Sequence, residues 1–88
     1  MDKIKQISDL SKCGAFVQIN PHKSYYQTAK ETIDESEIDE IEQGVYDKIC
    51  ETDSLIIVQA YPNTPVSFHM VYHYDLEHAL DKMIDLLS

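Results

Sequence analysis

The segment SLIIVQAY, residues 54–61, constrains the fold of this chain more than any other part of the sequence. Apolar residues occupy neighbouring positions in it, and neighbouring side chains of a β-strand point to opposite faces of a sheet. Strands that are apolar on both faces are normally covered on both faces. The sequence therefore predicts a strand here that needs helices, or a partner, on each side.

Two other segments also predict strands. Residues 14–20 alternate in hydrophobicity and stop at Asn20-Pro21, a dipeptide that interrupts a strand. Residues 66–74 alternate in the same way, and the turn PNTP separates them from residues 54–61. These last two strands are therefore expected to form a hairpin.

Apolar residues at helical spacing predict three helices. They indicate a short helix that ends before Gly14, a helix that runs from the N-cap Ser36 to Glu51, and a C-terminal helix that starts at the N-cap Asp75. Residues 25–33 fit either a short fourth helix or an extended segment, because their threonines and tyrosines also suit a strand.

These elements predict an α+β fold. We expect residues 1–88 to form a single small globular domain, since a chain of this length has room for one hydrophobic core. The expected architecture is a three-stranded mixed or antiparallel sheet packed on two to four helices, in the order α-β-α-β-β-α.

Strand alternation also predicts which residues face the core. The inward set consists of Ala15, Val17, Ile19, Ile56, Val58, Ala60, Phe68, Met70 and Tyr72. The opposite face then carries Phe16, Gln18, Leu55, Ile57, Gln59, Tyr61, His69 and Val71. Because this second face is too apolar for bare solvent, we predict that a homodimer or another protein partner covers it, with cover by the first helix as the alternative. The predicted interface residues are Phe16, Leu55, Ile57 and Val71.

The formal net charge of −9 is concentrated in the middle of the chain. Residues 31–53 hold ten acids against one lysine, whereas residues 1–30 hold five lysines against two acids. No arginine occurs in the sequence, which counts against recognition of phosphate groups or nucleic acid. The sequence therefore predicts a solvent-facing acidic helix whose partner, if it has one, is basic.

Two groups of polar and aromatic side chains are candidates for binding. The segment NPHKSYY, residues 20–26, concentrates them beside a turn, where a lysine next to a helix start suits a small anion or carboxylate. The predicted hairpin supplies a tyrosine and two histidines. The candidate binding residues are Asn20, His22, Lys23, Tyr25, Tyr61, His69 and His73.

The two histidines of the hairpin raise the question of a metal site. His69 and His73 have the four-residue spacing that places two ligands side by side on a helix. On a strand, four residues at about 3.3 Å each separate them by roughly 13 Å, which is too far to share one zinc ion. We therefore predict no metal and no cofactor, although His73 is expected to come near Asp75 and His78 where the strand runs into the helix.

No motif indicates catalysis, and no catalytic residue is predicted. Two glycines exclude a Gly-rich phosphate loop, and no nucleophile pattern is evident. The first ten residues lack signal-peptide features, and no apolar run suits a membrane span. The two cysteines are too far apart for a CxxC pair. Together these features predict a cytoplasmic protein. The sequence favours a non-catalytic interaction or accessory module that acts through its acidic helix and sheet face. The alternative is a small-molecule-binding or catalytic domain that uses the histidine, lysine and tyrosine residues near the end of the first strand.

Overall fold

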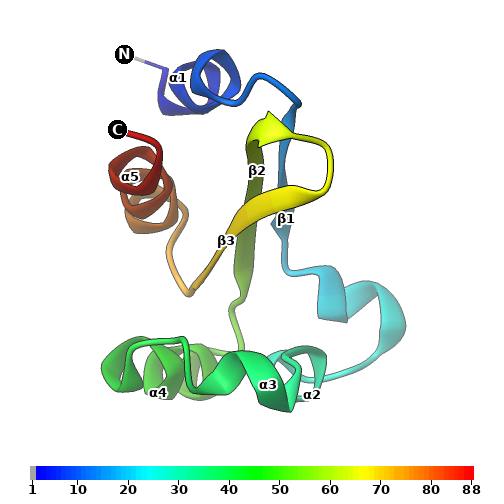
Figure 1. Cartoon of the computed structure of the whole chain (residues 1–88). Coiled ribbons are helices and arrows are strands. Elements are labelled where there is room, and N and C mark those ends of the chain that lie inside the picture. Colours follow the sequence, from blue (N-terminus) through cyan, green and yellow to red (C-terminus); the bar gives the residue numbers. More distant parts are fainter. Residues whose placement is uncertain (1) are drawn as a thin grey trace.

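Three antiparallel strands form the centre of the fold (Figure 1). The computed structural model describes residues 2–88. Strand β1 spans Ala15–Ile19, β2 spans Ile56–Thr64 and β3 spans Ser67–His73. β2 lies between the other two and pairs with both. The predicted α+β class, with a three-stranded antiparallel sheet packed on helices, is confirmed.

Two helices, α1 (Lys3–Leu10) and α5 (Leu76–Leu87), cover one face of this sheet. Each begins at an aspartate whose side chain accepts backbone N–H hydrogen bonds, Asp2 for α1 and Asp75 for α5, so the predicted cap of the last helix is confirmed. The core between the helices and the sheet consists of Ile7, Ile56, Val58, Ala60, Val71, Ala79, Leu80 and Met83.

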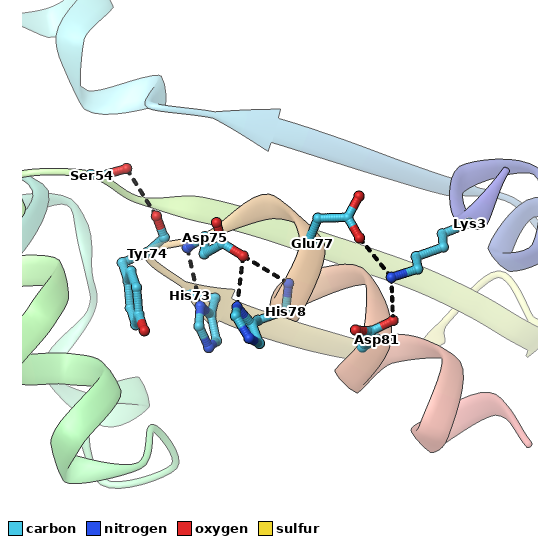
Figure 2. Close-up of polar contacts among 8 residues, drawn as sticks. All are labelled: Lys3, Ser54, His73, Tyr74, Asp75, Glu77, His78 and Asp81. Atoms are coloured by element: carbon cyan, nitrogen blue, oxygen red, sulfur yellow. Dashed lines mark hydrogen bonds and ion pairs between the residues drawn. The ribbon is translucent and has the colours of Figure 1, made fainter. Parts of the chain in front are cut away.

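An ion-pair cluster joins α1 to α5 at the rim of this first core (Figure 2). The Nζ atom of Lys3 lies 2.6 Å from Oε2 of Glu77 and 2.8 Å from Oδ1 of Asp81. Hydrogen bonds with Asp81 and Glu77 raise the pKa of Lys3, so its ammonium group stays charged. The cluster adds a polar contact to the packing of Ile7 against α5.

A second helical group covers the other face of the sheet around Leu55 and Ile57, and Figure 1 shows this group at the opposite end of the molecule from α1. Its members are η1 (Pro21–Tyr25, a 3-10 helix), α2 (Ala29–Thr32), α3 (Glu35–Ile38) and α4 (Gln43–Thr52). The second core consists of Ala29, Ile33, Val45, Ile49, Leu55 and Ile57. All residues from Leu55 to Ala60 are buried, so the prediction that both faces of this strand are covered is confirmed.

The predicted assignment of the β3 side chains to the two faces of the sheet is wrong. In the observed register Val71 lies opposite Val58, whereas Met70 and Tyr72 lie opposite Gln59 and Ile57. Directly opposed residues of an antiparallel pair share a face. Val71 therefore belongs to the first core, and Met70 and Tyr72 lie on the side of α3 and α4.

The predicted continuous helix from Ser36 to Glu51 is also wrong. α3 ends at Ile38, a turn follows, and α4 begins only at Gln43. In an unbroken helix the acids of this segment would stand three or four residues apart on one surface, where like charges destabilise the helix. The turn at residues 39–42 interrupts this helical spacing, although Glu37 and Glu40 stay close enough for Glu40 to raise the pKa of Glu37.

Residues 25–33 divide between two short elements. The 3-10 helix η1 ends at Tyr25, and α2 begins after Thr28, whose Oγ1 accepts the N–H of Glu31 at 3.2 Å. Part of this segment is therefore helical and part is not, which accounts for its mixed pattern.

The predicted interface residues are mostly inside the protein. Leu55 is 0% exposed, and Ile57 and Val71 are each 7% exposed, because α2 and α4 cover the first two and α5 covers the third. Of these four residues, Phe16 alone is exposed, at 45%. Within residues 2–88, no helix combines the length and the apolar character that crossing a membrane requires.

Candidate functional site

The structure does not bring the candidate binding residues into one site. They fall into separate places: the η1 segment, the β2–β3 hairpin, and the junction of β3 with α5. Among residues 2–88, no side-chain hydrogen bond, ion pair or ring contact joins one of these places to another. Each place is therefore described separately.

Asn20 has a structural role at the end of β1. Its backbone is in the left-handed region, with φ of 48°, a conformation that asparagine tolerates better than most residues. Its Oδ1 accepts the N–H of Leu55 at 3.0 Å, and its own N–H donates to the Leu55 carbonyl at 2.8 Å. These bonds extend the pairing between β1 and the start of β2.

His22 is fully enclosed by the protein, with 0% exposure. Its Nε2 lies 3.4 Å from Oδ1 of Asp53, and neither ring nitrogen makes a hydrogen bond within residues 2–88. The same Oδ1 accepts the N–H of Ala29 at 2.8 Å. This hydrogen bond, helped by the nearby His22 and Lys23, lowers the pKa of Asp53. Of the neighbouring candidates, Tyr25 is 74% exposed and Lys23 is also exposed, so neither shares an enclosed site with the buried imidazole.

Two candidates of the hairpin point to different faces of the sheet. Tyr61 accepts a hydrogen bond from Nε2 of Gln59 at 2.7 Å, and its ring lies 5.4 Å from that of Phe68. His69 lies opposite Ala60, on the face of the first core, and is exposed. They do not form a common pocket.

The predicted approach of His73 to Asp75 and His78 is confirmed (Figure 2). Nδ1 of His73 accepts the N–H of Asp75 at 3.1 Å, and the two imidazole rings stack with centroids 5.5 Å apart. Oδ2 of Asp75 lies 2.7 Å from Nδ1 of His78. On the other side of His73, the Tyr74 ring packs at 4.6 Å, and its carbonyl accepts a hydrogen bond from Ser54.

The hydrogen bonds of this cluster fix the tautomer of His73. Burial, and then the charge of Lys82, lower the pKa of His73, so its ring is neutral at pH 7. Because Nδ1 accepts the Asp75 N–H, the ring proton resides on Nε2 and neither nitrogen offers a free lone pair. Within residues 2–88, no three His, Cys, Asp or Glu side chains gather closely enough to hold a metal ion.

The buried His73 predicts a loss of stability in mild acid. In the folded protein the pKa of His73 is lowered below the ordinary value of 6.5, so the imidazole takes up a proton more readily in the unfolded chain. The free energy of unfolding therefore falls as the pH drops below about 7. We expect His73→Asn to flatten this fall, because Oδ1 of asparagine can still accept the Asp75 N–H but does not titrate. The measurement is the urea unfolding midpoint between pH 5 and pH 7.5.

His69→Asn is the matched control, because His69 is exposed on the same strand. It should keep the wild-type dependence on pH. The hydrogen-bonded carboxylate of Asp75 loses its stabilising effect only in stronger acid, because the His78 N–H lowers its pKa below 3.8. Parallel curves for the wild type and His73→Asn would contradict the assignment.

A groove of about 440 Å³ between the α3–α4 connection, β3 and α5 is a candidate binding site. Its apolar lining comes from Ile41, Val45, Met70, Val71, Tyr72 and Leu86. Its charged lining comes from Glu37, Glu40, Glu42, Asp85 and Lys82. Among these lining residues Lys82 is the one cation, and it is already paired with Glu42 at 3.0 Å.

The groove carries an unbalanced negative charge. Burial raises the pKa of Glu37, and the neighbouring Glu40 raises it further. Burial together with Glu37, Asp34 and Glu40 raises the pKa of Tyr72 on the groove wall. Burial, the largest cause of both shifts, disfavours charge of either sign. The part of each shift that comes from neighbouring carboxylates shows that another negative charge here is unfavourable, and this part would favour a positively charged group in the same place.

Sequence reasoning missed this groove because its lining comes from distant parts of the chain. The acids were expected on a solvated helix, and Met70 and Tyr72 were expected in the core. One signal was present in the sequence: Gly44 closely follows the acidic run, and glycine disfavours a helix interior. That glycine lies in the first turn of α4, directly after the break.

Comparisons of this chain with protein-family models, with curated proteins and with solved structures find no match.

Proposed function

We propose that this protein is a non-catalytic interaction module that binds a basic segment of a partner protein in the groove between α3, α4, β3 and α5. The observation that carries the proposal is a groove whose lining combines apolar residues with four acids and one paired lysine. The apolar lining provides contact area, and the unbalanced charge provides selectivity for a basic ligand. Phosphate-bearing ligands such as nucleic acid are disfavoured by the same acids.

Other surfaces support a function less well. A small-molecule site near the end of β1 would use His22, whose side chain has no exposed surface. Self-association through the sheet face needs an open apolar patch, but Leu55, Ile57 and Val71 are buried within the chain. Both cysteines are free and exposed, which supports the cytoplasm as the location, because thiols stay reduced there.

The proposal is tested with a set of seven-residue synthetic peptides in which lysine alternates with Val, Leu, Phe or Thr. We expect at least one of them to bind, and we expect moderate salt to weaken the complex, because exposed charges are screened. Glu40→Lys should weaken binding about tenfold or more, since it places a like charge near the incoming lysines. Isothermal titration calorimetry measures the affinity.

Two further variants sharpen the test. Glu51→Lys changes the net charge by the same amount on the exposed end of α4, outside the groove, and should leave the affinity near that of the wild type. Lys82→Gln removes the internal partner of Glu42 and should strengthen binding about threefold or more. Equal effects of Glu40→Lys and Glu51→Lys, or no binding by any peptide at about 1 mM, would contradict the proposal.

A further inference from the structure

We infer that the partner segment binds this groove as an extended strand that pairs with the open edge of β3, with basic side chains toward α3 and α4 and apolar side chains toward α5. This inference rests on the proposed function and specifies the conformation and the side-chain pattern of the ligand. It combines three properties of the groove: an unpaired strand edge, the facing of the β3 residues, and the distribution of charge around them.

β3 is an edge strand of the sheet. It pairs with β2 on one side and with no other strand of residues 2–88 on its outer side. In such a strand every second residue directs its N–H and C=O groups away from the sheet, where another strand can bind them. Soluble proteins usually protect an edge with charged residues or proline. The β3 sequence SFHMVYH contains no acid, lysine, arginine or proline.

The position of the groove matches this edge. Met70, Val71 and Tyr72 are successive residues of β3, and all three line the groove, which means that it follows the strand. Toward the hairpin the strand becomes exposed at Ser67, Phe68 and His69. An added strand lies about 4.8 Å from its neighbour, whereas a packed helix needs an axial separation of about 8 to 10 Å. Because the groove follows β3 along successive residues, an extended ligand paired with this edge fits it.

The facing of β3 predicts the side-chain pattern of this ligand. Met70 and Tyr72 point to the side of the second core, where Glu37 and Glu40 line the groove. Val71 points to the side of α5. Since opposed residues of paired strands share a face, ligand residues beside Met70 and Tyr72 meet acids. The residue beside Val71 meets the α5 side, where Leu86 offers an apolar contact and Lys82 disfavours a second basic residue. The recognised segment thus alternates basic and apolar residues.

Charge also decides which ligand the groove binds and which of the two edge strands, β1 or β3, that ligand pairs with. A second copy of this chain carries a net charge of −9 and would bring further acids toward the groove. β1, the other edge strand, is flanked in the sequence by Lys12 and Lys23 with no acid between them, a charge that does not favour a basic segment. A basic segment of a different protein is therefore the occupant that fits, and β3 is the edge that fits it.

Backbone N-methylation of the best-binding lysine peptide tests the inference. One peptide is methylated at all lysine amides, and its counterpart is methylated at all of the alternating apolar residues. In a paired strand only one of these sets points its N–H groups at β3, so one peptide should lose at least about tenfold in affinity while the other changes less than about threefold. Hydrogen exchange should at the same time show added protection at alternate amides of β3.

The outcomes separate this inference from the proposed function. If the unmethylated peptide binds and responds to Glu40→Lys, but both methylated peptides bind equally well, the groove is a ligand site and the added strand is wrong. The same conclusion follows if amides of β1, rather than β3, gain protection. If the unmethylated peptides do not bind at all, the proposed function itself is wrong. A dimer in sedimentation without peptide, together with hydrogen-exchange protection of alternate β3 amides in that dimer, would overturn the choice of occupant.

Discussion

Replacing Ile57 by lysine is expected to unfold the protein. Ile57 is 7% exposed and packs in the second core between β2 and the helices α2 and α4. The substitution removes about 2 to 3 kcal/mol of apolar burial and places an unpaired ammonium group in the core, at a further cost of several kcal/mol. A chain of 88 residues has a total stability of about 4 to 13 kcal/mol. The expected loss of stability is therefore comparable to the total stability of the protein.

Phe16→Lys is the matched control for this experiment. Phe16 lies on the same face of the sheet, opposite Gln59, but it is 45% exposed. Its replacement should cost about 1 kcal/mol or less. Far-ultraviolet circular dichroism in a urea titration compares the two variants. A stably folded Ile57→Lys protein that had lost only a dimer contact would show that this face is an interface and not an internal core.

Removing the buried imidazole of His22 is expected to have the next largest effect. The side chain is fully enclosed and lies 3.4 Å from Asp53, so truncation leaves a cavity beside that carboxylate. We expect His22→Ala to lower the free energy of unfolding by about 2 to 4 kcal/mol. Lys23→Ala should stay within about 0.5 kcal/mol of the wild type, because Lys23 is exposed.

His22→Leu separates packing from polarity at this position. Neither ring nitrogen of His22 makes a hydrogen bond within the described part of the chain, so a side chain of similar bulk without polar atoms should restore much of the stability lost in His22→Ala. The readout is again the urea midpoint. An unchanged midpoint in His22→Ala would contradict a packing role and would return His22 to the list of ligand-binding candidates.

The acidic segment shows how far sequence reasoning reaches for the candidate site. Its acids were correctly identified in the sequence as the dominant charge, and a basic partner follows from their sign alone. Their arrangement did not follow from the pattern, because helical spacing of Ile38, Ile41 and Val45 suits one helix as well as two. The break before Gln43 lets Glu37 and Glu40 approach Tyr72 of β3, and this approach creates the groove wall.

The seven candidate binding residues were chosen for their chemistry, and the structure gives several of them structural roles. Asn20 continues the pairing of β1 with β2, His22 fills space beside α2, and His73 accepts a hydrogen bond at the start of α5. Polar side chains in turns and at strand ends often satisfy backbone groups in this way. Composition cannot distinguish such a role from ligand binding, because both use the same donors and acceptors.

The sequence by itself determined the helices that have a single apolar stripe or a clear N-cap residue, and the need to cover both faces of β2. α1 and α5 carry a single apolar stripe, α5 starts at its predicted cap, and the apolar run of β2 required cover on both faces. Only the tertiary structure decided the facing of β3, since alternation has two possible phases and both phases of Ser67–His73 contain apolar residues. Pairing with β2 and packing of Val71 on α5 select one phase, because that arrangement buries Val71 and leaves Met70 and Tyr72 beside the acids.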